Sequence, residues 1–229
     1  MYETLKQRVY ETNMDLQRQG LVVLTWGNVS AIDREAGVIA IKPSGVPYEK
    51  LTPAAIVMLD LDGNVIEGSL KPSSDTATHV LLYQRFAGAG GVCHTHSTYA
   101  TMWAQARRDI PCFGTTHADS FYGSIPVTDP MTDEEIAGPY EENTGQVIVR
   151  RFAGTDPMQR PAVLVANHGP FTWGPTPEKA VENAVVLEQV AKMAFGTIQI
   201  NPPQQAISQA LLDRHYLRKH GKGAYYGQG

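Results

Sequence analysis

Four short runs rich in β-branched and aliphatic residues, close together in the first third of the chain, constrain the fold most strongly. They cover residues 22–32, 38–42, 56–61 and 65–67. Turn-forming residues, including Gly and Asp, lie between them. Short runs separated by such brief turns are typical of antiparallel strands. This part of the chain is therefore predicted to form an antiparallel sheet.

Helical periodicity replaces the strand pattern in most of the remaining chain. Residues 2–19 place Leu5, Val9 and Leu16 on a roughly helical period and stop at Gly20, a common residue after a helix. Residues 131–152 fit either a helix or a strand. Further helices are predicted over residues 75–86, 99–108, 177–198 and 204–219. The predicted class is mixed α/β, a largely antiparallel central sheet covered by helices on both sides, in a single domain over residues 1–229.

Composition and charge exclude two classes of partner. The formal net charge of −4 gives no field that would attract nucleic acid or an anionic membrane surface. No stretch is apolar and long enough to span a bilayer, and the N-terminus has no signal-peptide pattern. The two cysteines are too few for a disulfide framework. We therefore expect a cytoplasmic protein without a nucleic-acid or membrane partner.

Two histidines one residue apart, His94 and His96, follow the apolar run at residues 90–93. Side chains of a strand alternate between faces, so both imidazoles are expected to point the same way. His168 closes a second apolar run, residues 162–168, just before a Gly-Pro break. Three imidazoles can supply the protein ligands of a catalytic zinc-type site with an open position. The pair alone also fits ordinary hydrogen-bonded residues at a strand end.

Three small turns, residues 25–30, 42–45 and 71–75, have the composition of anion-binding sites. Backbone N–H groups and small hydroxyls that converge at such turns bind phosphate-type anions. Each turn alone equally fits an ordinary turn or helix cap, because Ser, Gly and Pro are common there.

Glu141 fits a solvated helical face. Tyr226 lies in a Gly-rich tail, where an aromatic residue must dock on something, such as a neighbouring subunit, to stay ordered.

In this order, these segments resemble the class II aldolase and epimerase family, and within it the L-ribulose-5-phosphate 4-epimerase branch. The resemblance runs nearly end to end. It rests on LTWGNVS (24–30), IKPSGV (41–46), KPSSDT (71–76), HTHS (94–97), GTTHAD (114–119), NHGPF (167–171) and HYLRKHG (215–221). The aldolase branch typically has Glu in place of Asp75 and lacks the segment that ends at Asp119.

The resemblance implies a role for each of these segments. The metal ligands would be His94, His96 and His168, with Asp75 as a fourth, labile ligand or near neighbour. Zinc suits these ligands best, although Mn²⁺ and Co²⁺ accept similar ones. The substrate phosphate would be held by Gly27, Asn28, Ser44, Gly45, Ser73 and Ser74, with Lys42 beside it.

The acid/base pair would be Asp119 and Tyr226. The family's homotetramer would bring Tyr226, in the tail at residues 221–229, into the site of a neighbouring subunit. The implied reaction interconverts L-ribulose 5-phosphate and D-xylulose 5-phosphate. C4 carries no hydrogen acidified by the carbonyl, so the chemistry calls for C3–C4 cleavage, rotation of the aldehyde fragment and re-addition. A metal would stabilise the enediolate, and two acid/base groups would serve the two faces.

Two other functions compete with this interpretation. A class II aldolase acting as a lyase on a phosphorylated ketose shares the cleavage step but releases the aldehyde. Asp75 and Asp119 favour the epimerase. The adducin head domain resembles the same fold without metal chemistry, and the full set of histidines argues against such a binding module. The sequence is compatible with either arabinose or ascorbate catabolism as the pathway that supplies the substrate.

Overall fold

One antiparallel sheet organises the protein. The structure, a computed structural model, describes residues 2–226. In this part of the chain, seven strands follow the order β4-β3-β2-β1-β5-β7-β6, and every neighbouring pair is antiparallel. The strands are β1 (Asn28–Asp33), β2 (Val38–Ile41), β3 (Val57–Asp60), β4 (Val65–Glu67), β5 (Gly91–His94), β6 (Ala162–Leu164) and β7 (Pro170–Gly174).

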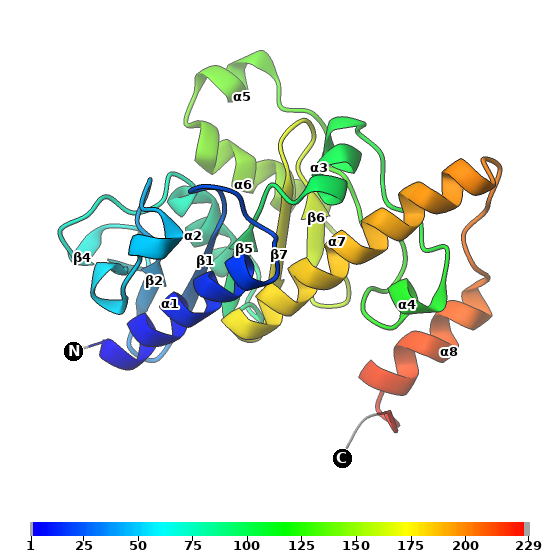
Figure 1. Cartoon of the computed structure of the whole chain (residues 1–229), viewed down its shortest axis with the longest axis horizontal. Coiled ribbons are helices and arrows are strands. Elements are labelled where there is room, and N and C mark those ends of the chain that lie inside the picture. The colour runs from blue at the N-terminus through cyan, green and yellow to red at the C-terminus, as the bar shows by residue number, and fades with distance from the viewer. Residues whose placement is uncertain (1, 227–229) are drawn as a thin grey trace.

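Helices cover both faces of this sheet (Figure 1). They are α1 (Glu3–Arg18), α2 (Thr76–Arg85), α3 (Thr98–Gln105), α4 (Thr115–Ala118), α5 (Asp133–Ala137), α6 (Tyr140–Arg151), α7 (Pro177–Ile200) and α8 (Gln209–His220), with short 3-10 turns at Tyr48–Lys50 and Pro53–Ala55. Successive residues of a strand point to opposite faces of the sheet, so they pack against different layers of helices. Ile39 and Ile41 pack in the cluster with α2 and α6, whereas Val38 and Ala40 pack with Val9 of α1. The predicted mixed α/β class is confirmed.

Some element boundaries differ from those predicted, for local reasons. The strand predicted over residues 22–32 begins only at Asn28, because Leu24 and Gly27 have positive φ angles of 56° and 76° that turn the preceding segment. Residues 131–152 form the helices α5 and α6, and a capping box between Thr132 and Glu135 starts the first of them. Strand β7 was not predicted, because Pro170 was interpreted only as a break; proline is tolerated as the first residue of a strand.

A close approach between β5 and α7 fixes the centre of the fold. A Cβ atom added at Gly91 would lie only 2.3 Å from the Cα atom of Pro177. Glycine therefore allows the first turn of α7 to pack directly on β5, the strand that leads to His94. Within the described residues, no helix has the length and apolar character needed to cross a membrane.

Candidate metal centre and active site

Sheet register places the first histidine beside a polar and an aromatic neighbour. His94, the last residue of β5, pairs with Asn28 of β1 on one side and Phe171 of β7 on the other. Its ring stacks on Phe171 with 4.1 Å between centroids, and its Nδ1 lies 2.9 Å from the carbonyl oxygen of Pro170. A carbonyl only accepts, so Nδ1 carries the proton and Nε2 keeps a free lone pair. Such a hydrogen bond orients a histidine that binds a metal.

The other two histidines reach the same point from irregular segments. His96 lies two residues beyond the end of β5, and its Nε2 is 3.1 Å from Nε2 of His94. Strand β6 ends at Leu164, so His168 lies in the turn before β7 rather than at the predicted strand end. Asn167 has a positive φ angle of 63°, and a Cβ atom added at Gly169 would be 2.9 Å from a backbone oxygen. This tight turn brings His168 to the pair.

The three histidines form a group that can hold a divalent metal. One ligand atom from each lies within 4.8 Å of the others. Burial and the neighbouring His94 and His96 lower the pKa of His168 to about 4, and burial and His94 lower the pKa of His96. Neutral imidazoles are the form that binds metals. Nδ1 of His168 is buried and has no hydrogen-bond partner among the described residues. A convergent and partly unsatisfied set of this kind fits a metal ion.

Asp75 lies next to the histidines but outside their close group. It is the residue before α2, and its Oδ2 accepts hydrogen bonds from Nδ2 of Asn28 at 2.6 Å and from Oγ of Ser73 at 3.4 Å. Burial acts to raise the pKa of Asp75, but electrostatic interactions with His94 and His79 and the Asn28 hydrogen bond outweigh it, so the pKa is lowered. The structure thus places a carboxylate beside the group, and direct coordination by Asp75 stays a prediction.

One cavity of about 540 Å³ joins the histidines to the three predicted anion-binding turns. Backbone hydrogen bonds hold two of the turns together, since Ser73 N–H donates to Lys42 O and Ser44 N–H donates to Lys71 O, both at 3.0 Å. The predicted metal and phosphate residues that line the cavity are Gly27, Asn28, Lys42, Ser44, Gly45, Ser73, Ser74, Asp75, His94, His96 and His168. Turns distant in the sequence thereby converge where a phosphate and a metal could be held together.

Lys42 is the cationic residue among those that line this cavity. Within the described part of the chain its Nζ has only weak partners, the carbonyl oxygens of Thr25 and Pro43 at 3.5 Å and the ring of Tyr48 at 4.9 Å. Burial lowers the pKa of Lys42 to about 8. No carboxylate of the described residues forms an ion pair with it. A buried ammonium group without a carboxylate partner favours the binding of an anion.

Several cavity residues were not singled out from the sequence. Tyr140, Glu141 and Thr144 reach the cavity from the first turns of α6, so the interpretation of Glu141 as part of a solvated face was wrong. Thr78 of α2, which also lines the cavity, donates a hydrogen bond to the backbone oxygen of Glu141 at 2.5 Å. The ambiguous pattern of residues 131–152 concealed this contribution, because only a helix in this position directs them inward.

His79, a buried residue of α2, was also not singled out from the sequence. Its Nδ1 lies 2.7 Å from Oγ of Ser30, which lies 2.8 Å from the hydroxyl of Tyr83. Its position four residues after Asp75 was the available signal, because residues i and i+4 share a helix face. This buried network supports the strand and helix that carry Asn28 and Asp75.

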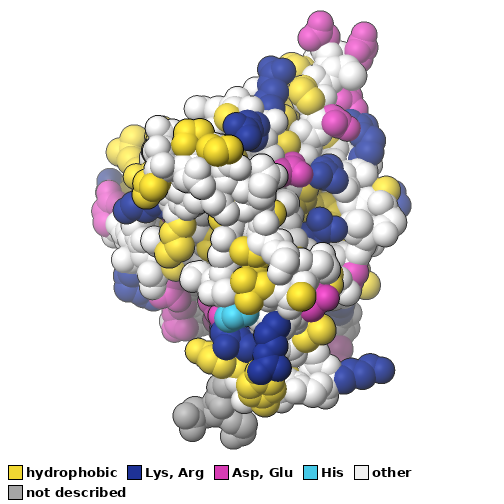
Figure 2. Space-filling model, turned by 90° about the vertical axis from the view of Figure 1, so that its right-hand side faces the viewer, with side chains coloured by type: hydrophobic (Ala, Val, Ile, Leu, Met, Phe, Trp, Pro, Cys, Tyr) yellow, Lys and Arg dark blue, Asp and Glu magenta, His cyan; other side chains and the backbone are white. Residues whose placement is uncertain are grey.

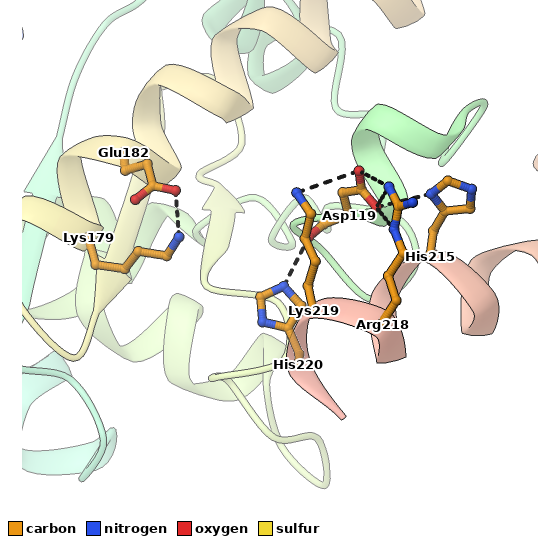
Figure 3. Close-up of polar contacts among 7 residues, drawn as sticks. All are labelled: Asp119, Lys179, Glu182, His215, Arg218, Lys219 and His220. Carbon is orange, nitrogen blue, oxygen red and sulfur yellow. Dashed lines mark hydrogen bonds and ion pairs between the residues drawn. The ribbon is translucent and has the colours of Figure 1, made fainter. Parts of the chain in front are cut away.

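The predicted acid/base residues lie elsewhere in the chain, away from the cavity lining. Asp119 directly follows α4, and α4 packs against α8 beyond the end of the sheet (Figure 1). Figure 3 shows its carboxylate surrounded by side chains of α8, from His215, Arg218 and Lys219, while His220 contacts its backbone oxygen at 2.9 Å. On the face shown in Figure 2, Lys and Arg side chains gather around a histidine.

The charge of these neighbours controls the ionisation of Asp119. Partial burial acts to raise its pKa, but hydrogen bonds from Arg218 and His215 and the charge of Lys219 outweigh it and lower the pKa. Tyr226 lies close by and is exposed. The centroid of its ring is 4.7 Å from the guanidinium of Arg218. Asp119 and Tyr226 therefore share one surface, which is separate from the histidine cavity of the same chain. The last residues of the predicted interface tail, 227–229, lie outside the described residues.

Comparison with known proteins identifies the family. The profile described as "Class II Aldolase and Adducin N-terminal domain" matches residues 7–195 of the chain. The chain belongs to this family. Its class II aldolase fold is shared by a solved L-fuculose 1-phosphate aldolase, with a TM-score of 0.78 and 26% identity over 93% of this chain and 94% of that one. The expected family and fold are thereby confirmed.

Within the class II aldolase and adducin family, much more similar sequences carry an epimerase name. The L-ribulose-5-phosphate 4-epimerase UlaF of Salmonella paratyphi C (strain RKS4594) is 55% identical over 226 residues, covering 99% of each chain. The protein of the same name from Salmonella typhi is 54% identical with the same coverage. The similarity therefore includes the α4 and α8 segments as well as the histidine cavity.

Proposed function

We propose that this protein is an L-ribulose-5-phosphate 4-epimerase, a metal-dependent isomerase that interconverts L-ribulose 5-phosphate and D-xylulose 5-phosphate. The observation that carries this proposal is the cavity in which three histidines face the anion-binding turns. Its chemistry matches a phosphorylated sugar that chelates a metal. The 55% identity to named epimerases over 99% of both chains supports the same activity.

The reaction begins with binding of the phosphate by the backbone N–H groups and hydroxyls of the turns at Ser44, Gly45, Ser73 and Ser74, with Lys42 supplying positive charge. Asn28 lies between this end and the histidines, where it orients Asp75. When bound by His94, His96 and His168, a divalent metal supplies Lewis-acid stabilisation of the negative charge left by C3–C4 cleavage. The phosphate contacts retain the aldehyde fragment while it rotates and re-adds.

The acid/base step uses two groups that do not line the histidine cavity of their own chain. Asp119 and Tyr226 supply them from a neighbouring subunit of a homotetramer, because both lie on one surface at the end of the molecule. Two such groups serve opposite faces of the C4 oxygen, which differs in position between the epimers. The cationic side chains of Arg218 and Lys219 help to hold the Asp119 carboxylate ionised, which is the form that can accept a proton.

Three finer assignments belong to this proposal. Zinc is the expected metal, since three imidazoles and a carboxylate suit it, with Mn²⁺ and Co²⁺ as alternatives. A cytoplasmic location fits two buried free cysteines, Cys93 and Cys112. The single-domain organisation over residues 1–229 fits a sheet whose strands come from residues 28–174.

Product analysis tests the activity. L-ribulose 5-phosphate is incubated with the purified protein, with and without a chelator, and the products are followed by NMR. We expect D-xylulose 5-phosphate, and we expect the chelator to abolish it. Accumulation of free dihydroxyacetone and glycolaldehyde phosphate instead would identify the lyase alternative, because these are the fragments of C3–C4 cleavage.

Subunit mixing tests the shared site. The variants His96→Asn and Tyr226→Phe are each expected to be nearly inactive, since one lacks a metal ligand and the other an acid/base group. When they are unfolded together and reassembled, some neighbouring pairs combine an intact histidine set with an intact Tyr226. Random assembly of equal amounts restores about a quarter of the sites, half multiplied by half. Failure to regain activity, while wild-type protein regains it after the same treatment, would place the whole site within one chain.

A further inference from the structure

One side chain of α8, Arg218, contacts both predicted acid/base residues. Its guanidinium donates to the carboxylate of Asp119 from Nε to Oδ1 at 3.2 Å, from Nη2 to Oδ1 at 3.0 Å and from Nη2 to Oδ2 at 2.9 Å. The same group lies over the ring of Tyr226, and the backbone oxygen of Arg218 accepts the N–H of Tyr226 at 3.2 Å. Arg218 therefore connects α4 to the C-terminal tail.

The other basic side chains around Asp119 make contacts of a different kind. His215 reaches the carboxylate at 3.0 Å and His220 reaches only the backbone oxygen. Lys219 also approaches both acid/base groups, but its Nζ lies 3.6 Å from the carboxylate, outside hydrogen-bond range. An ammonium group acts as a point charge, whereas the planar guanidinium imposes a direction on the carboxylate it binds. Arg218 thus has the geometry to orient Asp119, which a charge alone does not provide.

We infer that Arg218 is the positioning residue of the acid/base pair, holding the Asp119 carboxylate in one orientation and docking Tyr226 beside it so that both enter a neighbouring site as one unit. This inference rests on the proposed function, because it assumes that Asp119 and Tyr226 exchange protons with the substrate. Arg218 does not line the histidine cavity. Its loss should therefore disturb proton transfer and leave metal binding unchanged.

The test compares Arg218→Ala with a matched control, Arg214→Ala. Arg214 lies one turn earlier on the same helix and covers the ring of Tyr225, with 5.7 Å between the guanidinium and the ring centroid. The structure gives Arg214 no hydrogen bond or ion pair to Asp119. Misplacement of reacting groups by about 1 Å costs up to about 100-fold in rate. We expect Arg218→Ala to lower kcat by about 10- to 100-fold with KM and metal content unchanged, and Arg214→Ala to retain kcat within about twofold.

Two further readouts separate positioning from a structural contribution. Free guanidinium at tens of millimolar should restore part of the kcat of Arg218→Ala and leave Arg214→Ala unchanged. The acid limb of the pH profile should move to higher pH in Arg218→Ala, because Asp119 loses the hydrogen bonds that lower its pKa. The titratable or charged groups that still face Asp119 are His215, Lys219 and His220, all from α8, and the same three remain in the control.

If the alanine variant does not assemble, Arg218→Lys tests the positioning role instead, because lysine keeps the positive charge and lacks the planar guanidinium. We expect kcat to fall in this variant as well. A kcat within about twofold of wild type in Arg218→Ala or Arg218→Lys would overturn the inference. Equal losses in the Arg218→Ala and Arg214→Ala variants would also overturn it. A wild-type protein that forms no D-xylulose 5-phosphate would instead refute the proposed function itself.

Discussion

Replacement of Lys42 by methionine is expected to stabilise the protein while weakening substrate binding. The chain length of the side chain is nearly kept, but the buried charge is removed. Burial lowers the pKa of Lys42 from 10.5 to about 8, and each factor of ten in acidity is worth about 1.4 kcal/mol. Holding this ammonium in the folded protein at pH 7 therefore costs about 3 kcal/mol. The lost interaction with the Tyr48 ring offsets about 1 kcal/mol.

The net gain of Lys42→Met is thus about 2 kcal/mol at pH 7, and its pH dependence has a definite sign. Between pH 8 and 10.5 the unfolded chain holds the lysine proton more firmly than the folded one. The unfolded state then binds more protons, so the free energy of unfolding of the wild type rises with pH in this window. The cost of the buried charge falls below about 1 kcal/mol at pH 10, where the advantage of the variant should disappear.

Two measurements check this prediction. Urea unfolding at fixed protein concentration, at pH 7 and pH 10, gives the difference in stability between wild type and Lys42→Met. Steady-state kinetics give KM, which for the wild type should rise about tenfold from pH 7 to pH 9, as the charged fraction of a lysine with a pKa of about 8 falls from about nine-tenths to one-tenth. KM of the variant should be higher and flat. A variant that is less stable than wild type at pH 7, or a flat wild-type KM, would refute the reasoning.

Two other substitutions test the remaining parts of the site. His96→Asn should lower the metal bound per subunit, measured by elemental analysis, because one of three converging imidazoles is lost; a fully loaded and active variant would remove His96 from the ligand set. Tyr226→Phe should lower kcat by about 100-fold or more with metal content unchanged, and Tyr225→Phe is its control. Unchanged turnover in Tyr226→Phe would exclude a proton-transfer role for that hydroxyl.

Local patterns in the sequence were sufficient to predict many of the residues that line the cavity. Strand alternation predicted that His94 and His96 converge, and the two imidazoles do, although His96 lies beyond the strand end. His168 was chosen for a partly wrong reason, since a turn rather than a strand carries it. The turn still brings His168 to the other two histidines, because the Gly-Pro break that ends the apolar run also forms the tight turn. The short turns around Ser44 and Ser73 could also be predicted from the sequence, because their composition is itself the signal.

Long-range packing determined what the sequence did not reveal. Glu141 enters the cavity only because α6 packs on α2, a contact between segments far apart in the chain. Within the described residues, Lys42 has no carboxylate partner. Its surroundings come from three loops that are far apart in the sequence, so no single segment predicts this. The link from Arg218 to Asp119 and Tyr226 depends on how α8 docks on α4. Propensity and periodicity describe single elements, so such tertiary contacts lie beyond their reach.

The fate of the hydrogen on C4 tests the central claim most directly. L-ribulose 5-phosphate is converted in D₂O by the metal-loaded protein, and the D-xylulose 5-phosphate formed is analysed by NMR and mass spectrometry. Cleavage and re-addition of the C3–C4 bond keep the C4 hydrogen on carbon throughout. The account therefore predicts a product with hydrogen at C4 and no product when a chelator is present. Deuterium at C4, or equal conversion with the chelator, would contradict it.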